Sequence, residues 1–471
     1  MDNNQAVLMS DWRIDEIAGL CAGSVLNAPR SEIRGFSIDT RTISDGDAFV
    51  AIKGDRFDGH DYIPQALAKR IPAILASRFP PGAVASRQTA CILVEDPLRA
   101  LQDLARFQRS RHKGLFLGVT GSNGKTTTKE MLRHIFSEKS DTWATSGNLN
   151  NHIGLPLNLV RIPLKTKVAI VEMGMNHPGE IRFLAEISKP QTAVITNVGP
   201  AHIGILGSLE NIALAKSEIL SGLPPDAFGV VDGDSEFLPL FKKTCPARLV
   251  TFGFGANCEM RGCDLLMLAD GVRFNAIWGS EKAKVDLPLL GKHNAMNALA
   301  ALAVFVSQGH PLAAGAERLA SFPPVGARME SHLVDGVRVI LDCYNANPAS
   351  MLQAVDFLRI CPGKRVAVLG EMRELGEDSP RFHAQVGSAV AKAGIDVLVA
   401  VGEQARLIAD GAKSQGMHAE VVHFFPTSGE AIGLIETLLK EKTTILLKAS
   451  RGMHFESITR VVWPSLPCDL H

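Results

Sequence analysis

Hydrophobic and polar positions follow a strand-then-helix rhythm along most of the chain. Near-continuous apolar runs at 115–119, 168–173 and 193–198 are typical of strands buried on both faces of a parallel sheet. Polar and apolar residues at helical spacing separate them. The rhythm returns in the last third, with strand candidates at 337–341, 365–369, 397–401, 420–424 and 444–447. This alternation predicts two α/β sheets, the second of them doubly wound.

Two regions depart from that rhythm. Residues 258–290 read as short strands separated by Gly and Asp turns, which indicates an antiparallel appendage before an apolar helix at 294–307. Near the start, short apolar runs at 33–38, 48–52 and 73–76 lie among turn-rich segments. They predict a small mixed α/β domain.

Proline and glycine mark two boundaries, in RFPPGAVASRQ at 78–88 and SFPPVGAR at 321–328. We therefore expect an α/β protein of three domains. They are a small N-terminal α/β domain (1–86), a central parallel-sheet domain (87–324) and a C-terminal doubly wound domain (325–471).

Composition narrows the class of protein. The 471 residues include 49 Lys+Arg and 49 Asp+Glu, and this balance argues against a protein that holds nucleic acid mainly by neutralising phosphates. The longest apolar stretch, 295–306, is shorter than the roughly 20 residues of a membrane span. No basic and apolar leader opens the chain, and its eight cysteines form no CxxC pair. We expect a cytoplasmic enzyme with no membrane span and no nucleic-acid partner.

The segment GLFLGVTGSNGKTTTKEML at 114–132 has the layout of a phosphate-binding loop. A buried strand runs into Gly121 and Gly124, and Lys125 and Thr126 then open a helix. Glycines let backbone N–H groups surround a phosphate, the lysine adds a positive donor, and the threonine offers a hydroxyl to Mg²⁺. The strict GxxxxGK[ST] pattern needs glycine at 119, where this chain has Val119. The alternative is a glycine-rich turn with a chance GKT.

Three further groups are candidates for chemistry. Glu172 ends one predicted strand and His202 follows another, and ligands of open parallel sheets bind beyond such ends. Read singly, Glu172 could equally be a packing carboxylate and His202 a satisfied loop histidine. Lys216 has Ile212, Ile219 and Leu220 nearby on a predicted helix, and its bland interpretation is a surface lysine with a buried stem.

Several long motifs converge on one family. TGSNGKTTT, VEMGMNHPGEI, TNVGPAHIGILGS, ALAKSEI, LLGKHNAMNALAA and CYNANPAS resemble the Mur ligases of peptidoglycan synthesis. The asparagine-rich TSGNLNNHIGLPLNL, together with YNANP and GEMRELGEDS, resembles the members that add D-alanyl-D-alanine. The N-terminal SIDTRTISDGDAFVAIKGDRFDGHDYI and the C-terminal LLKASRGMHFE fit the same family, so the resemblance spans all three predicted domains.

The resemblance implies an ATP-dependent ligase that forms an amide bond. UDP-N-acetylmuramoyl-tripeptide, D-Ala-D-Ala and ATP would give the pentapeptide precursor, ADP and phosphate, through an acyl phosphate. This is the last cytoplasmic step of precursor peptide assembly, which serves cell-wall formation, cell shape and division. ATP and Mg²⁺ are the implied cofactors, the C-terminal domain is expected to be Rossmann-like, and we expect a monomer.

The resemblance also assigns site residues. The catalytic set is Lys125, Glu172, His202 and Lys216. Mg²⁺ would be held by Thr126, Glu172, His202 and, if carbamylated, Lys216. ATP would contact Gly121, Ser122, Asn123, Gly124, Lys125, Thr126, Thr127, Asn294, Arg328 and Asp342. Family members often show two aspartates where this chain has Leu341 and Asp342.

The substrates would be bound by all three domains. The UDP group would contact Asp39, Thr40, Arg41, Lys53, Gly54, Asp58, Gly59 and His60. The muramoyl-peptide would contact Asn148, Asn150 and Asn151. The dipeptide would lie near Tyr344, Asn345 and Asn347, together with the GEMREL loop at 370–375. Asparagine amides suit peptide recognition because each offers both donors and acceptors.

Two other functions fit part of this pattern. A ligase similar to folylpolyglutamate synthase would share the central fold and the acyl-phosphate chemistry, but residues 37–63 favour a UDP-type domain instead. A nucleotide-gated regulatory protein would need a phosphate loop without the full metal-binding set. Measuring ATP consumption with and without the precursor separates these hypotheses.

Overall fold

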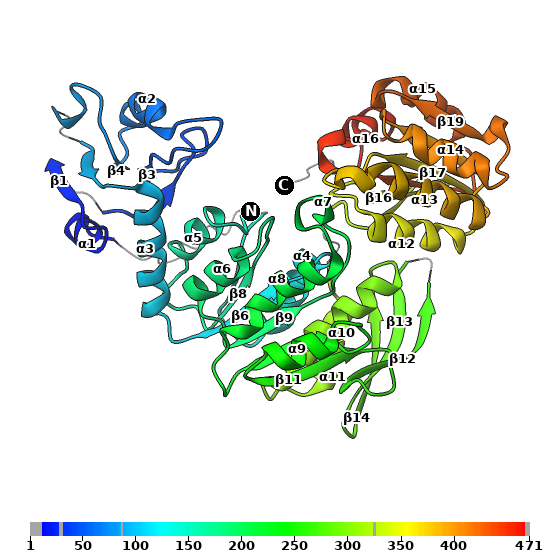
Figure 1. The fold of residues 1–471 in the computed structure, drawn as a ribbon, viewed down its shortest axis with the longest axis horizontal. Helices are drawn as coiled ribbons and strands as arrows, with labels where there is room; N and C mark the ends of the chain where they lie inside the picture. Colours follow the sequence, from blue (N-terminus) through cyan, green and yellow to red (C-terminus); the bar gives the residue numbers. More distant parts are fainter. Residues whose placement is uncertain are drawn as a thin grey trace.

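The computed structural model places three sheets in the order that the sequence predicts, and it describes residues 12–27, 32–85, 88–147, 149–268, 270–323 and 326–466. The domains form a V (Figure 1). The N-terminal domain and the C-terminal domain are its arms, and the central domain is its base. Asn148, expected to contact the muramoyl-peptide, lies outside the described residues.

The N-terminal sheet has the order β1-β5-β4-β3-β2, and among its described strands only β1 runs antiparallel to its neighbour. Its strands are β1 (Ser24–Asn27), β2 (Gly35–Ser37), β3 (Asp47–Val50), β4 (Ala73–Ala76) and β5 (Ala90–Leu93). Its helices are α1 (Ile14–Leu20) and α2 (Ile63–Ala68), with 3₁₀ turns at Gly59–Tyr62 and Ala83–Ala85. Because β5 pairs with both β1 and β4, this sheet extends beyond the boundary expected at residue 86. The prolines at 80 and 81 lie in the connection between β4 and β5, inside the domain and not at its end.

Helix α3 (Pro97–Arg111) joins this domain to the central one. Asp96 caps its first turn by accepting from the N–H groups of Leu98 and Arg99. At its other end, the buried Arg109 guanidinium donates to carbonyl oxygens at the end of α6 (Glu180–Ser188), including that of Ser188 at 2.5 Å. The linking helix is therefore anchored by polar contacts at both ends.

The central sheet has nine strands among the described residues, in the order β14-β13-β12-β11-β10-β9-β6-β8-β7. They are β6 (Leu115–Thr120), β7 (Thr142–Ala144), β8 (Val168–Glu172), β9 (Thr192–Ile195), β10 (Phe228–Asp232), β11 (Arg248–Gly253), β12 (Met260–Met267), β13 (Val272–Trp278) and β14 (Glu281–Leu287). The three predicted parallel strands and the antiparallel appendage are confirmed. β7, β10 and β11 were not predicted: β7 has only three residues, and the apolar runs of β10 and β11 are interrupted by glycine or polar residues.

Helices cover both faces of this sheet. One core contains α4 (Lys125–Phe136), α10 (Lys292–Ser307) and α11 (Leu312–Ala320). The opposite face carries α5 (Gly154–Leu159), α6, α7 (Ile203–Leu206), α8 (Leu209–Ser221) and α9 (Leu238–Thr244). Helix α10 is buried almost all round, which explains its apolar sequence. No helix in the described ranges is long and apolar enough to cross a membrane.

The C-terminal sheet has the order β15-β16-β20-β17-β18-β19, and β15 alone among its described strands is antiparallel. The strands are β15 (Glu330–Val334), β16 (Val337–Asp342), β17 (Lys364–Gly370), β18 (Val397–Val401), β19 (Val422–Phe425) and β20 (Thr443–Lys448). One face carries α12 (Pro348–Arg359), α13 (Ser379–Lys392) and α14 (Arg406–Ser414), and the other α15 (Ser428–Leu438) and α16 (Glu456–Val462). Further 3₁₀ turns lie at Gly376–Asp378, Ala419–Val421 and Arg451–Met453. The predicted doubly wound architecture is confirmed.

Candidate active site

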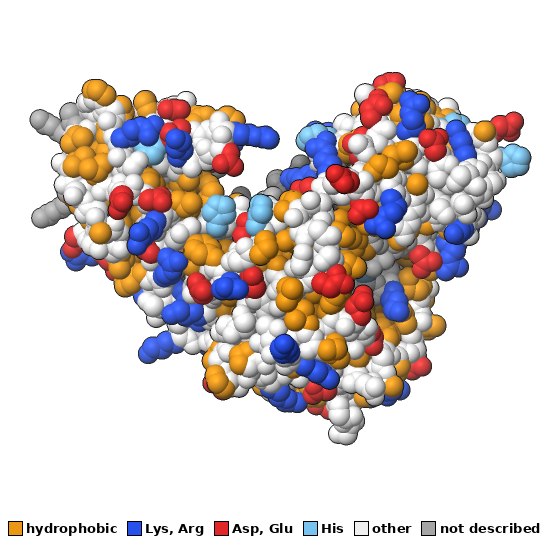
Figure 2. Space-filling model, viewed as in Figure 1, with side chains coloured by type: hydrophobic (Ala, Val, Ile, Leu, Met, Phe, Trp, Pro, Cys, Tyr) orange, Lys and Arg blue, Asp and Glu red, His pale blue; other side chains and the backbone are white. Residues whose placement is uncertain are grey.

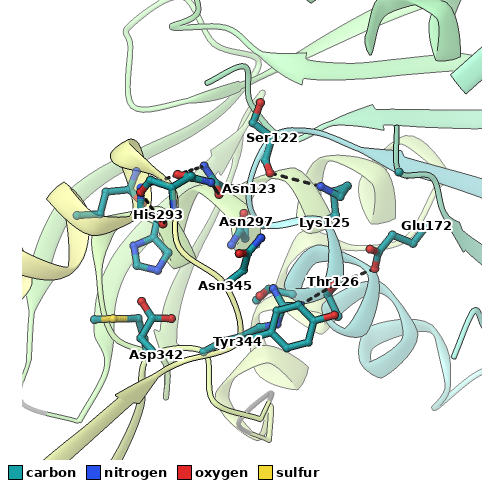
Figure 3. A pocket seen from close by; sticks show the side chains of 18 of the residues that line it. Ser122, Asn123, Lys125, Thr126, Glu172, His293, Asn297, Asp342, Tyr344 and Asn345 are labelled. Atoms are coloured by element: carbon teal, nitrogen blue, oxygen red, sulfur yellow. Dashed lines mark hydrogen bonds between the residues drawn. The ribbon is translucent and has the colours of Figure 1, made fainter. Parts of the chain in front are cut away.

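The predicted phosphate loop connects β6 to α4 at the carboxyl edge of the central sheet (Figure 3). Helix α4 begins at Lys125 without a side-chain cap, so its first N–H groups can serve a ligand. Gly124 precedes it at φ 79°, and a Cβ there would meet the Asn297 side chain. Glycine is therefore required both by the backbone conformation and by the close approach of α10.

Lys125 lies back over this loop. Its ammonium donates to the carbonyl oxygen of Gly121 at 2.8 Å. It also donates to that of Ser122 at 3.3 Å (Figure 3). Burial lowers the pKa of Lys125, although the nearby Glu172 acts in the opposite direction. The loop itself is held from the end of β9, where the Thr196 hydroxyl donates to the Asn123 carbonyl at 2.5 Å.

Oxygen atoms of the kind that bind divalent cations meet beside the loop. The Thr126 hydroxyl donates to Glu172 Oε2 at 2.9 Å, and Glu172 Oε1 accepts from Asn150 Nδ2 at 2.8 Å. A hydroxyl and a carboxylate are the oxygen ligands that Mg²⁺ prefers, so these residues fit the ion. His202 lies by the same cavity, but its Nδ1 is 2.8 Å from Glu374 Oε2 of the C-terminal domain.

Lys216 is buried, and this overturns its interpretation as a surface lysine. The residue is 2% exposed on α8, and within the described ranges no hydrogen bond or ion pair of its ammonium is found. Burial lowers its pKa well below the usual lysine value, and the charge of Lys125 lowers it further. Its amine is therefore far more readily neutral, and so nucleophilic, than that of an exposed lysine.

These groups line one cavity of about 370 Å³ between the central and C-terminal domains. The sequence-predicted residues that it brings together are Ser122, Asn123, Gly124, Lys125, Thr126, Thr127, Asn150, Glu172, His202, Lys216, Asn294, Arg328, Asp342, Tyr344, Asn345 and Asn347. A single site therefore contains residues predicted to bind the nucleotide and the metal, and some of those predicted to bind the substrates.

The two domains touch across this cavity. Arg328 Nη2 donates to the Thr126 hydroxyl at 3.1 Å, and Asn347 Nδ2 donates to Asn123 Oδ1 at 2.6 Å. Asn347 also caps α12, where its side chain accepts from the Ser350 N–H. The Asn347 amide is therefore already engaged, which makes it less available to a dipeptide than predicted.

Several cavity residues were missed by the sequence reasoning. Asn297 follows Asn294 by three residues and therefore shares its face of α10, a spacing that could have identified it. Lys448 belongs to the KASR segment that fits the family resemblance, but its partner could not be read from the sequence: it ion-pairs with Asp342 at 2.6 Å from the neighbouring strand β20. Other missed lining residues are Gly174, Met175, Asn176, Met329, Ser350 and Gln353.

A second cavity, of about 360 Å³, adjoins the first. Both are lined by Ser122, Lys125, His202, Tyr344, Asn345 and Asn347. The second adds two guanidinium groups, from Arg373 and Arg451, and Glu374. Arg451 and Arg328 both lie over the Tyr344 ring, at 5.3 and 3.8 Å from its centroid.

The N-terminal candidates lie elsewhere, and within the described residues none of them lines the central cavity. His60 borders a separate cavity of about 290 Å³ with Arg78 and Phe79, two residues that the sequence reasoning missed. The Asp58 carboxylate accepts from the His60 N–H and from Arg78, and these bonds lower its pKa. Gly59 passes so close to the backbone of Ile52 that a Cβ would collide with it.

Other predicted substrate residues have local roles. Asp39 binds Arg41 at 2.7 Å in an exposed ion pair, and the Thr40 hydroxyl donates to Gln65. Lys53 and Gly54 are exposed on the surface of this domain. The Asn151 side chain accepts from the N–H groups that begin α5.

Comparison with known proteins covers nearly the whole chain. The Mur ligase family catalytic domain matches residues 32–109, the Mur ligase middle domain residues 119–305, and the Mur ligase glutamate ligase domain residues 327–451. The UDP-N-acetylmuramoyl-tripeptide–D-alanyl-D-alanine ligase of Bacillus subtilis is 36% identical over 95% of this chain and 97% of its own. The Escherichia coli enzyme of the same name is 36% identical over 91% and 94%.

Solved structures agree in architecture. MurF from Acinetobacter baumannii matches with a TM-score of 0.88 and 31% identity over 96% of this chain and 99% of its own. MurF from Thermotoga maritima, in complex with ADP, matches with a TM-score of 0.80 and 29% identity over 91% and 96%. Folylpolyglutamate synthase from Mycobacterium tuberculosis, at 17% identity and a TM-score of 0.63 over 79% of this chain and 95% of its own, shares the fold alone. Because the three domain models match in order and relatives 36% identical cover more than nine tenths of its length, this chain belongs to the Mur ligase family.

Proposed function

We propose that this chain is an ATP-dependent ligase that joins D-Ala-D-Ala to UDP-N-acetylmuramoyl-tripeptide and releases ADP and phosphate. One observation carries the proposal. The phosphate loop, the Thr126–Glu172 oxygen pair and the buried Lys216 line one cavity with residues of the C-terminal domain. Near-full-length similarity to enzymes of that name supports the choice of substrates.

The nucleotide half of the reaction is assigned to the phosphate loop. The N–H groups at the start of α4 and the Lys125 ammonium would contact phosphate oxygens, and Arg328 would add a planar donor from the other domain. Asn294 would lie near the base and Asp342 near the ribose. Phosphoryl transfer depends mainly on such positioning and charge neutralisation.

We assign Mg²⁺ to Thr126 and Glu172, with His202 and a carbamate on Lys216 as further ligands. The ion would neutralise charge that develops on the transferred phosphoryl group. A neutral buried amine can attack carbon dioxide and lose a proton to water, and the resulting carbamate would offer an oxygen ligand where an ammonium would repel the ion. The burial of Lys216 supports this modification.

The bond changes follow from an acyl phosphate. The terminal carboxylate of the tripeptide attacks the γ-phosphorus, and ADP leaves. The dipeptide amine then attacks the carbonyl carbon, loses a proton and expels phosphate, forming the amide. Closure of the two domains around the cavity would protect the acyl phosphate from water.

The second cavity suits the dipeptide. D-Ala-D-Ala ends in a carboxylate, for which Arg373 and Arg451 offer charged planar donors. The cavity reaches Lys125 and Asn345, so an amine bound there would face the site of acyl phosphate formation. The cavity at His60 and Arg78 would hold part of the UDP group. The reaction draws on ATP and a UDP-linked precursor, so we place the enzyme in the cytoplasm, and a monomer stays our prediction.

The test is an assay of phosphate and amide product from ATP, with each amino substrate and its matching UDP precursor. D-Ala-D-Ala should support turnover, while L-Ala, D-Glu and a diamino acid should not. Activity with another amino acid would leave the chain a Mur ligase but assign it to a different step of precursor assembly. Addition of glutamate to a folate would favour the folylpolyglutamate synthase alternative. A regulatory binder would form no amide with any pair.

The matched variant for this assay is Lys125→Ala. It should abolish turnover because no other side chain of the loop supplies a positive charge to the phosphates, while circular dichroism and the unfolding temperature stay near those of the parent. A near-normal rate would refute the phosphate-loop assignment.

A further inference from the structure

A second lysine of α4 is buried deeper than the phosphate-loop lysine and takes no part in the function proposed above. Lys129 follows Lys125 by one helical turn, but it is absent from the lining of the cavity. Its side chain is 1% exposed, which makes it one of the largest fully buried side chains in the described residues. A charged ammonium is rarely buried in this way unless it is paired.

The Lys129 ammonium has three oxygen neighbours. It donates to the backbone carbonyl of Thr145 at 2.7 Å, lies 3.1 Å from Glu130 Oε1 and lies 3.9 Å from Glu172 Oε2. Thr145 begins the asparagine loop, which we define as residues 145–147 and 149–151. Lys129 therefore stands between this loop and the carboxylate assigned to the metal.

Further hydrogen bonds connect the asparagine loop with Glu172 and with the residues that follow it. The Glu172 N–H donates to the Thr145 hydroxyl at 3.0 Å, and Asn150 at the other end of the loop donates to the Glu172 carboxylate. The Asn150 carbonyl in turn accepts from the Gly174 N–H at 2.9 Å. Glu172 thus has neutral donors from the loop on one side and a fixed ammonium on the other.

We propose that Lys129 is a positioning residue that holds Glu172 and the asparagine loop in one arrangement, and so couples the metal site to the site of the muramoyl-peptide. This rests on the proposed roles of Glu172 and of the loop. The ammonium acts through its geometry: it bonds the start of the loop while it faces the carboxylate. It contacts no reacting atom and is therefore not a catalytic residue.

The direction in which the Mg²⁺ requirement of Lys129→Met changes distinguishes a positioning role from a simple effect of the lysine's charge. A cation about 4 Å from a carboxylate competes with Mg²⁺, so if the geometry stayed fixed, Lys129→Met would lower the Mg²⁺ concentration for half-maximal activity. Positioning predicts the opposite. Losing a group that orients a metal ligand typically weakens metal affinity by about 10–100-fold, so we expect the half-saturating Mg²⁺ concentration to rise by at least about tenfold.

The coupling predicts a second readout. Lys129→Met should also raise the KM for UDP-N-acetylmuramoyl-tripeptide by about tenfold, because the loop loses the bond at Thr145. The KM for D-Ala-D-Ala should stay within about twofold, because the second cavity does not touch the loop. Titration calorimetry of the UDP precursor, without nucleotide or metal, should show the same weakening.

Two variants serve as controls. Glu130→Gln removes the more exposed partner of Lys129 and Lys139→Met removes an exposed lysine just after α4, and neither should change the Mg²⁺ or precursor values. If Lys129→Met does not fold, Lys129→Gln keeps an N–H donor for the Thr145 carbonyl and should show a smaller shift in the same direction.

The inference is overturned if either folded variant of Lys129 leaves the Mg²⁺ and precursor values unchanged or tightens Mg²⁺. Glu172→Gln identifies the other kind of failure. If that variant keeps normal Mg²⁺ dependence, then the assignment of the metal site is wrong, whatever Lys129 does.

Discussion

A buried lysine without a partner costs stability, and Lys216 has no hydrogen-bond or ion-pair partner among the residues that the structure describes. Its lowered pKa means that the folded chain binds a proton there less readily than the unfolded chain does. In the pH range between the two pKa values the unfolded chain holds one more proton, so this residue destabilises the fold increasingly as the pH falls. The proposed carbamate gives a functional reason for keeping the residue.

We therefore expect Lys216→Met to raise the unfolding temperature of protein freed of bicarbonate, by about 1 °C for each kcal/mol regained if all 471 residues unfold together and by about 2–4 °C if the central domain unfolds as its own unit. The gain should be greatest at low pH and should shrink as the pH approaches about 10, where the unfolded lysine also loses its proton. Thermal unfolding across that range checks this, with the exposed Lys243→Met as control. A gain that grows with pH would contradict it.

The same residue carries a prediction about activity. Lys216→Ala should lose turnover, because the proposed carbamate can no longer form, and short-chain carboxylic acids should restore part of it by supplying the missing oxygen ligand. An unaltered rate in Lys216→Ala would refute the metal-ligand role.

At the scale of elements, the phosphate loop is shaped jointly by its own glycines and by a helix that lies far away in sequence. Gly124 has φ 79°, and Asn297 of α10 occupies the space that a Cβ would need. Asn297 also donates to Asn294 Oδ1, which fixes the amide toward the loop. The start of α4 is thus packed against α10, so the donors of the loop are oriented before nucleotide binds.

Gly124→Ala should therefore weaken ATP binding by at least about tenfold, since left-handed strain costs roughly 1–3 kcal/mol for a non-glycine residue and the clash with Asn297 adds to it. Titration calorimetry with ATP measures the effect. Gly222→Ala is the matched control, because its φ is −93° and a Cβ there would meet nothing within 4 Å. Equal affinities in the two variants would show that the loop tolerates a side chain.

At the scale of the whole molecule, the hollow between the arms of the V separates the N-terminal domain from the C-terminal one (Figure 2). The central and C-terminal domains instead meet at the site. The contacts Arg328–Thr126, Asn347–Asn123 and Glu374–His202 all end on groups of the predicted nucleotide and metal set. The placement of the C-terminal domain and the geometry of the site are therefore linked.

Substitutions at Asn347 can distinguish the effect of the contact between the two domains from the effect of the cap on α12. Asn347→Ser keeps a good cap for α12 but is too short to reach Asn123, so the unfolding temperature should hold while kcat/KM falls, by up to about tenfold for one lost hydrogen bond. Asn347→Ala should lose the same activity and also about 1 kcal/mol of stability. Steady-state kinetics and thermal unfolding of both variants provide the test, and full activity in Asn347→Ser would contradict the link.

The sequence alone allowed much of the architecture to be predicted, because buried parallel strands leave continuous apolar runs and a phosphate loop is a single segment. Glu172 and His202 were placed correctly at strand ends for the same reason. The boundary near residue 86 failed because prolines look alike in a linker and in a turn within a domain. Only the pairing of β5 with β1 and β4 distinguishes the two.

The local pattern of apolar and polar residues thus accounts for most helices and strands. It also accounts for the phosphate loop, because the groups of that loop are neighbours in the chain. The tertiary structure decides the environment of each remaining group. Lys216 and Lys129 sit on helices whose residue spacing cannot show whether another layer covers them, and packing buries both. The pairing of Lys448 with Asp342 likewise arises only because β20 lies beside β16 in the sheet. Burial and partners depend on contacts between distant segments, and these form only when the sheets are assembled.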